Sequence, residues 1–204
     1  MLKRTTGRLL LTLLVITGLA GTLNNSSLSP RERKQAIILI KNSRKLVLNS
    51  VEGLSPRQLK YRPSSKDFSI GELIMIMALK EKNGSDQIRM AMAQPANAEN
   101  RLQIALTDDQ LLATDNYSFC KIDAASSAAA EWKDPKEAIS KFSGLQNEHI
   151  RYIRTSTEDL RNHVIQTPAG WIDCYQYYLL LADQNTYLAE KINAIKKLPR
   201  FPKK

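Results

Sequence analysis

The sequence predicts an all-α protein, a four-helix bundle that follows an N-terminal export signal. Three observations predict this fold: four long segments carry apolar residues at helical spacing, capping motifs mark the helix starts, and no segment alternates apolar and polar residues over a sustained length. The composition agrees, because 43% of the 204 residues are hydrophobic and 25% are charged. These values are typical of a globular chain and exclude a disordered or collagen-like one.

The first predicted helix spans residues 30–52 and begins with a capping box. Ser29 can accept a hydrogen bond from the amide of Glu32, Glu32 can accept one from the amide of Ser29, and Pro30 suits the first helical position. Gly53 can take the left-handed conformation that ends a helix. The apolar stripe of this helix consists of Ile37, Ile40, Val47 and Val51.

Three more long helices are predicted, over residues 70–93, 135–155 and 172–197. Ser69 and Glu72 form a second capping box, Asp134 caps the third helix, and the fourth helix ends before Pro199. Helices of this length span about 30–40 Å and bury their apolar stripes economically as a four-helix bundle.

The connection between the second and third long helices, residues 96–133, is unusually long. A short helix is expected after Thr107 within it, and another short helix is expected after Ser55. Connections of this length are usually functional or packed over a site.

The first twenty residues form a separate segment. Lys3, Arg4 and Arg8 precede an apolar run that ends at Ala20, which is the pattern of a cleaved signal peptide. An uncleaved membrane anchor is the alternative, although the run is short for a bilayer span. The predicted division is a signal peptide (1–20), a linker (21–29), the bundle domain (30–202) and the end of a basic tail (203–204). The mature protein is therefore expected to be exported, to the periplasm or the exterior.

The net charge is +10, from 30 Lys and Arg against 20 Asp and Glu. Three of these cations belong to the signal peptide, and five more lie in the last nine residues. We interpret the excess as a solvated surface with a basic tail. No nucleic-acid-binding motif is present, so nucleic acid is not an expected partner. Membrane contact is expected only through an uncleaved N-terminal segment or the tail.

Four motifs agree in order and spacing with one known family. They are residues 52–63 (EGLSPRQLKYRP), 68–73 (FSIGEL), 155–163 (TSTEDLRNH) and 199–202 (PRFP). Together they resemble the DinB-like superfamily, in its exported subgroup, and the resemblance extends over about residues 30–202. It implies a four-helix bundle, in agreement with the helix pattern.

The resemblance also implies a divalent metal, often zinc or nickel, held by one histidine on the second long helix and two on the last. The corresponding positions in this chain are Ile76, Gln184 and Leu188. Ile and Leu carry no ligand atom, and a Gln carbonyl suits hard cations better than zinc. No histidine occurs in residues 70–93 or 172–197. We therefore expect no metal and no cofactor, with Ile76 and Leu188 in the core.

The two histidines of the chain, His149 and His163, lie outside those segments and are interpreted as surface or hydrogen-bonded polar residues. A metal site rebuilt from Glu81, Asp183 and Gln184 is the alternative to complete loss of the metal.

The two cysteines, Cys120 and Cys174, are candidates for a disulfide, because an exported chain meets an oxidising environment. An alternative is a catalytic Cys174 whose thiolate is stabilised at the start of the last helix.

Aromatic residues cluster at Trp171, Tyr175, Tyr177 and Tyr178 and are expected to pack in the core or to line a ligand pocket or a dimer face. The residues proposed for a pocket are Glu81, Asp183, Tyr175 and Tyr178.

The function predicted from these observations is that of an exported DinB-like protein without the metal triad, acting as a non-catalytic ligand-binding or interaction module. A homodimer and an unidentified small ligand are the candidate partners. The alternative is a divergent transferase or hydrolase that uses the family pocket with chemistry other than that of histidine.

Overall fold

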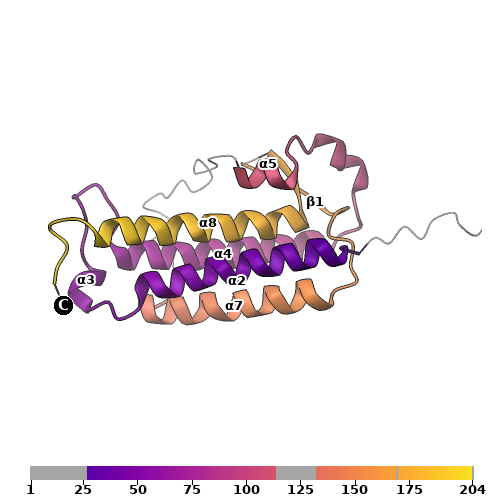
Figure 1. Cartoon of the computed structure of the whole chain (residues 1–204). Helices are drawn as coiled ribbons and strands as arrows, with labels where there is room; N and C mark the ends of the chain where they lie inside the picture. The colour runs from indigo at the N-terminus through magenta and orange to yellow at the C-terminus, as the bar shows by residue number, and fades with distance from the viewer. Residues whose placement is uncertain (1–26, 114–131, 169, 204) are drawn as a thin grey trace, which may run out of the picture.

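The structure, a computed structural model, describes residues 27–113, 132–168 and 170–203, and its main body is a bundle of four long helices (Figure 1). These helices are α2 (Pro30–Val51), α4 (Ile70–Met92), α7 (Pro135–Thr155) and α8 (Cys174–Lys196). The predicted fold class is confirmed, and each helix boundary lies within two residues of its predicted position. The predicted signal peptide and linker lie outside the described residues, except for the last residues of the linker.

The helix starts have the predicted caps. Ser29 and Ser69 each form a complete capping box with the Glu three residues later, and Asp134 accepts from the amide of Glu137. Gly53 has a φ of +65° directly after the end of α2, so it takes the left-handed position that its sequence context predicts.

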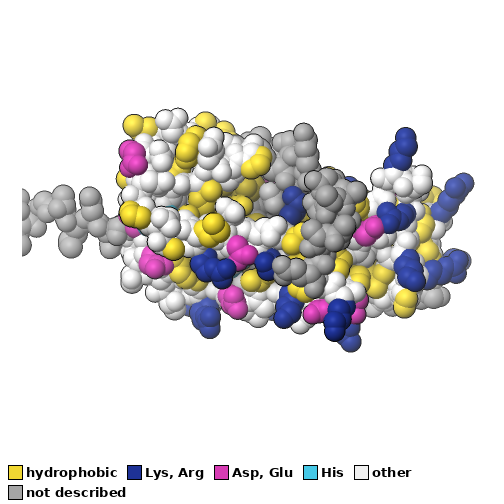
Figure 2. Space-filling model, turned by 180° about the vertical axis from the view of Figure 1, so that it is seen from behind, with side chains coloured by type: hydrophobic (Ala, Val, Ile, Leu, Met, Phe, Trp, Pro, Cys, Tyr) yellow, Lys and Arg dark blue, Asp and Glu magenta, His cyan; other side chains and the backbone are white. Residues whose placement is uncertain are grey.

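Neighbouring helices in the sequence are not all neighbours in the bundle. α2 packs against α7 and α8, and α4 packs against the same two helices. Consecutive long helices α2 and α4 therefore occupy diagonal corners, and α7 and α8 occupy the other two. Helix α3 (Pro56–Leu59) and the C-terminal residues lie at one end of the bundle, where exposed Lys and Arg side chains gather (Figure 2).

The other end of the bundle carries the short elements. The connection after α4 contains a 3-10 helix, η1 (Ala98–Gln103), and a short helix, α5 (Asp108–Ala113). Helix α5 packs against α8. Helix α5 confirms the short helix that was predicted after Thr107. Residues 114–131 of the same connection lie outside the described residues.

An antiparallel hairpin of β1 (Val164–Thr167) and β2 (Gly170–Asp173) precedes α8 and departs from the purely helical prediction. Its strands have four residues each, which is too short for an alternating pattern to be visible in the sequence. Asp173 ends the hairpin and caps α8 through a capping box with Gln176. This cap moves the helix start from the predicted residue 172 to residue 174.

The apolar core has two main parts along the bundle axis. One contains Ile40, Ile150 and Leu179, and the other contains Val47, Phe142 and Leu188. The level between them is polar, because each helix contributes buried polar residues there: Ser43, Glu81, Gln146, His149 and Asn185. We call this set the polar layer. Among the described helices, none is long and apolar enough to cross a membrane.

Candidate functional site

The polar layer is organised around the carboxylate of Glu81, which is 0% exposed. Its Oε1 accepts from Nε2 of Gln146 at 2.6 Å and lies 2.9 Å from Nδ1 of His149. Its Oε2 accepts from Nδ2 of Asn185 at 2.7 Å. A buried carboxylate is costly unless it is paired and hydrogen-bonded, and donors from α7 and α8 meet this requirement.

The contact with Glu81 orients the ring of His149. A carboxylate can only accept hydrogen bonds, so the proton between the two groups belongs to Nδ1 of the imidazole. The other ring nitrogen, Nε2, is buried and has no hydrogen-bond partner among the described residues, and the same holds for Oε1 of Gln146. Leaving one such atom unpaired costs about 1–3 kcal/mol. The two unpaired atoms make the polar layer a candidate binding site.

The His149 ring belongs to a cleft of about 570 Å³ between α4 and α7. Its inner wall includes Ile88, Tyr178 and Tyr152, and the ring of Tyr178 meets that of His149 edge-on at 5.0 Å. Burial raises the pKa of Tyr178, and burial together with a hydrogen bond to Glu158 raises that of Tyr152 to about 12. Both phenols therefore stay neutral at physiological pH.

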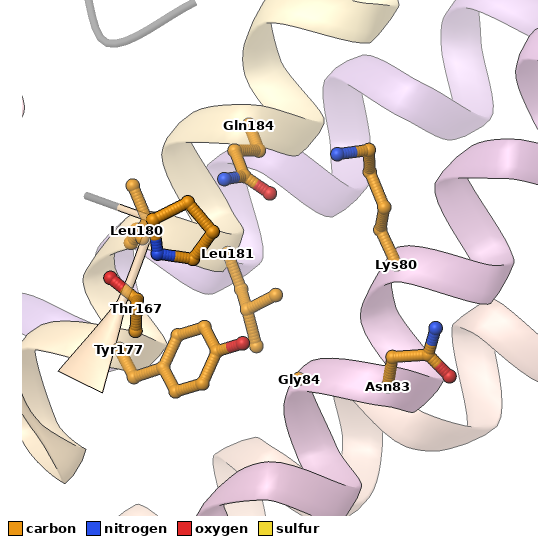
Figure 3. A pocket seen from close by; sticks show the side chains of 9 residues that line it. Lys80, Asn83, Gly84, Thr167, Tyr177, Leu180, Leu181 and Gln184 are labelled. Atoms are coloured by element: carbon orange, nitrogen blue, oxygen red, sulfur yellow. The ribbon is translucent and has the colours of Figure 1, made fainter. Parts of the chain in front are cut away.

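A second cleft, of about 150 Å³, lies between α4, α8 and the hairpin (Figure 3). Its polar lining consists of Lys80, Asn83, Thr167 and Gln184, and its apolar lining includes Leu180, Leu181 and the ring of Tyr177. In the close-up the side chains of Lys80 and Gln184 face each other across the opening from α4 and α8.

The three positions that the sequence resemblance predicts to replace metal ligands have different surroundings. Ile76 and Leu188 are fully buried, and Gln184 lines the small cleft. A zinc or nickel ion does not fit this set, since two of the three side chains are hydrocarbon. Within the described part of the chain, no three His, Cys, Asp or Glu side chains form a group that could hold a metal ion.

The four residues proposed for one pocket are not brought together. Glu81 and Tyr178 both lie beside His149. Asp183 is only half-buried, and burial, with a smaller effect from Glu190, raises its pKa. Tyr175 belongs to a third site.

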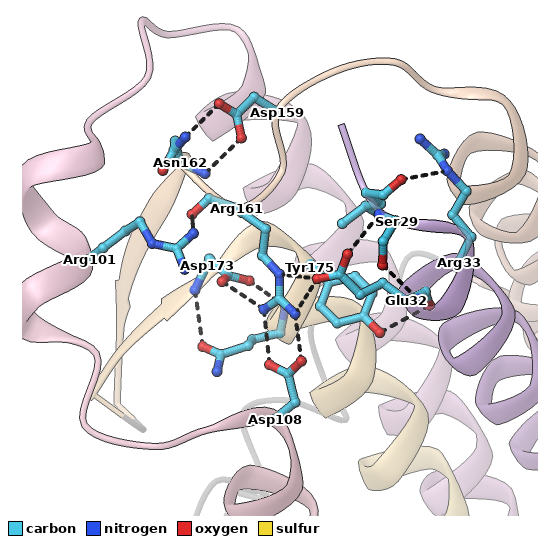
Figure 4. A network of polar contacts seen from close by, with 12 residues as sticks. Ser29, Glu32, Arg33, Arg101, Asp108, Asp159, Arg161, Asn162, Asp173 and Tyr175 are labelled. Atoms are coloured by element: carbon cyan, nitrogen blue, oxygen red, sulfur yellow. Dashed lines mark hydrogen bonds and ion pairs between the residues drawn. The ribbon is translucent and has the colours of Figure 1, made fainter. Parts of the chain in front are cut away.

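That third site is a network around Arg161 at the hairpin end of the bundle (Figure 4). Arg161 donates to carboxylates from three elements: Glu32 at the start of α2, Asp108 at the start of α5 and Asp173 at the start of α8. Its guanidinium lies 4.1 Å from the centre of the Tyr175 ring, and the Tyr175 hydroxyl donates to the carbonyl of Glu32. Through these contacts the network joins α5 in the long connection and the start of α8 to the start of α2.

The surroundings of Cys174 do not favour the alternative in which its thiolate is a catalytic group. The residue is fully buried, and this burial, with the nearby Asp173 carboxylate, raises the pKa of its thiol to about 12. A stabilised thiolate would have a lowered pKa instead. Cys120 lies outside the described residues, so the disulfide stays a prediction.

The role of His149 is more specific than its sequence context indicates, whereas His163 is hydrogen-bonded as expected. The ring nitrogens of His163 lie 2.7 Å and 3.1 Å from the carbonyls of Asp159 and Gln94. The signal for His149 was its spacing, because it lies on the same α7 face as Phe142, Gln146 and Ile153, all of them buried. A polar pair three residues apart on an apolar face indicates a buried partner.

A solved structure shares this fold. The chain is similar to YfiT from Bacillus subtilis, described as a probable metal-dependent hydrolase with an unusual four-helix bundle topology. The TM-score is 0.59 at 13% sequence identity, over 84% of this chain and 89% of that one. The likeness shows a common four-helix bundle fold. The sequence matches no protein-family model and no curated protein.

Proposed function

We propose that this protein is an exported member of the DinB-like superfamily that binds a small carboxylate in the cleft between α4 and α8, without a metal. The observation that carries the proposal is the lining of this cleft. The two helices that would carry the family's histidines contain none, and Gln184, one of the three corresponding positions, is part of the lining.

The lining indicates the class of ligand. The ammonium group of Lys80 and the amide groups of Asn83 and Gln184 can donate hydrogen bonds to an anion. Leu180, Leu181 and Tyr177 offer an apolar wall beside them. The volume of about 150 Å³ matches that of a cavity that holds benzene. A carboxylate with one ring or a short alkyl chain satisfies both requirements.

A thermal-shift series tests the ligand class. Benzoate and hexanoate should raise the unfolding temperature, whereas benzamide and hexanol should not. At a ligand concentration of 100 times Kd the expected stabilisation is about 2.7 kcal/mol. Lys80→Met should abolish the shift, and Gln87→Ala, an exposed position on the same helix, should leave it unchanged. Equal shifts with benzoate and benzamide, or none with either, would contradict the proposal.

Metal content tests the other half of the proposal. The purified mature protein should hold far less than one zinc or nickel per chain. About one tightly held ion per chain would show that the metal function persists through other residues. The proposed export is tested by the mass of the mature protein, which should lack residues 1–20.

The alternative of a divergent transferase or hydrolase built on Cys174 or on Asp183 has less support. The buried Cys174 thiol is not activated, and no hydrogen bond or ion pair joins Asp183 to Glu81 among the described contacts.

A further inference from the structure

The cleft between α4 and α7 carries a separate inference, because its lining includes His149, whose Nε2 is one of two buried side-chain atoms without a hydrogen-bond partner among the described residues. His149 is 4% exposed, its Nδ1 is held by the buried carboxylate of Glu81, and its Nε2 has no partner among the described residues. This arrangement fixes the direction of the ring and leaves one nitrogen for a ligand.

We propose that this cleft is a second ligand site, in which Nε2 of His149 binds the hydroxyl of a small phenol and takes up its proton. The site is independent of the α4–α8 cleft, since the two linings share no residue.

The proton transfer follows from the Glu81–His149 pair. The O–H bond of the phenol breaks and an N–H bond forms at Nε2, which gives a phenolate and an imidazolium, so no oxidant or co-reactant is needed. The imidazolium then lies 2.9 Å from the Glu81 carboxylate, which stabilises its new charge. Because Nε2 is buried, the hydrogen bond forms in a low-dielectric environment that strengthens it.

The walls of the cleft favour an aromatic ligand. The rings of Tyr178 and Tyr152 and the side chains of Ile88 and Met92 form an apolar and aromatic part of the lining, and His149 is also part of it. Aromatic rings gain from edge-to-face contacts of the kind that Tyr178 already makes with His149. The volume of the cleft, about 570 Å³, lies within the range of small-molecule sites.

The charged groups of the lining are compatible with a bound phenolate. Arg89 and Arg151 face the cleft, together with the carboxylates of Glu148 and Glu158. The Glu158 carboxylate is occupied by the Tyr152 hydroxyl, and Arg89 pairs with Asp86, so neither dominates the potential at Nε2.

The test compares 4-nitrophenol with 4-nitrotoluene, which has the same ring but no hydroxyl. The full-length mature protein should bind 4-nitrophenol at least tenfold more tightly, and the bound ligand should show the absorption band of the phenolate at a pH where the free phenol is mostly protonated. Equal affinities, no binding of either compound, or a bound neutral phenol would each overturn the proposal.

Three variants and one matched control locate the site. His149→Phe should remove the preference for the hydroxyl, and His163→Phe is its matched control and should keep it. Ser85→Trp should fill the cleft from α4, so both compounds should lose affinity. Glu81→Gln should keep binding but weaken the phenolate band, because the imidazolium loses its counter-charge. A preference that survives both His149→Phe and Ser85→Trp in folded protein would place the phenol elsewhere.

Discussion

Arg161 and Asp108 form a bidentate pair, with Nη1–Oδ1 and Nη2–Oδ2 distances of 2.9 and 2.5 Å. The pair joins the segment before α8 to the first turn of α5, 53 residues away in the sequence. The same guanidinium also reaches Glu32 and Asp173, so one side chain holds three carboxylates that would otherwise repel one another.

Replacing Arg161 by Met should therefore destabilise the protein strongly. The substitution leaves Asp173, which is 1% exposed, without its cation, and breaking a buried pair in this way costs about 3–5 kcal/mol. Arg161→Lys should cost less, because it keeps the charge but loses the planar fork. Urea unfolding measures both. Arg89→Met is the control: its pair with Asp86 is exposed, so it should change stability by less than about 1 kcal/mol.

The buried thiol of Cys174 predicts a loss of stability in alkali. Its pKa is about 12 in the folded protein against an ordinary value of 9.0, so between these pH values the unfolded chain has released a proton that the folded chain still holds. The free energy of unfolding must then fall as the pH rises through this window, by up to about 4 kcal/mol from this group. Below pH 9 the effect should vanish.

Cys174→Ala isolates this contribution. Tyr152 also has a raised pKa, so the wild-type protein should lose stability in alkali for more than one reason, and the variant should lose less between pH 9 and 12. The measurement is urea unfolding across the pH range, with alkylation of the native protein as a second readout. Rapid alkylation of Cys174 at neutral pH, or an identical pH slope in the variant, would show that the thiol is not buried as described.

The helices were predictable from the sequence, whereas the polar layer was not, and the difference is physical. Caps and breakers such as Ser29, Ser69 and Gly53 act within a few residues, so the local sequence determines where a helix begins and ends. Whether Glu81 faces water or the core depends on which residues of α7 and α8 lie opposite it. In its own segment, Lys80-Glu81-Lys82-Asn83, it is indistinguishable from an exposed residue.

The same limit applies to the metal positions. Ile76 and Leu188 were expected in the core, and both are fully buried. Their equivalence to the metal ligands of the DinB-like superfamily is a prediction from the sequence motifs, and an experiment on this chain tests it.

Restoring the three histidines provides that experiment. The combined variant Ile76→His, Gln184→His and Leu188→His should bind about one zinc or nickel per chain if the positions are equivalent, because residues 184 and 188 share a helix face. Without metal it should be less stable, since two imidazoles replace buried hydrocarbon. A shifted control, Met77→His, Asn185→His and Ala189→His, should bind much less. Equal metal content in the two variants would contradict the assigned positions.

The polar layer predicts a large difference between single and combined substitutions. Glu81→Leu alone should cost about 3–5 kcal/mol, because donors from Gln146, His149 and Asn185 lose their shared acceptor. Replacing Glu81, Gln146, His149 and Asn185 together by apolar residues of similar volume should be neutral or stabilising. Urea unfolding measures stability, and binding of 4-nitrophenol should disappear in the combined variant. A combined variant that binds as the wild type does would separate the ligand from this layer.

The close contact between Gly84 of α4 and Leu181 of α8 predicts opposite effects for two helical glycines. A Cβ at Gly84 would lie 2.6 Å from Cδ2 and 3.2 Å from Cγ of Leu181, so the buried Leu181 side chain, which also lines the small cleft, would have to shift. Gly84→Ala should therefore displace the Leu181 side chain from its packed position and cost about 1–3 kcal/mol. At Gly144 in α7 a Cβ would meet nothing within 4 Å, so Gly144→Ala should stabilise the helix by about 0.5–1 kcal/mol.

The unfolding temperatures of the two alanine variants check this contrast, because both variants carry the same substitution, glycine to alanine. The clash at Gly84 also bears on the small cleft, because Gly84 and Leu181 both line it. Gly84→Ala should thus weaken benzoate binding as well as stability, whereas Gly144→Ala should leave binding at the wild-type value. If both variants were stabilised equally, the α4–α8 distance would have to be larger than the structure describes, and the cleft between these helices correspondingly wider.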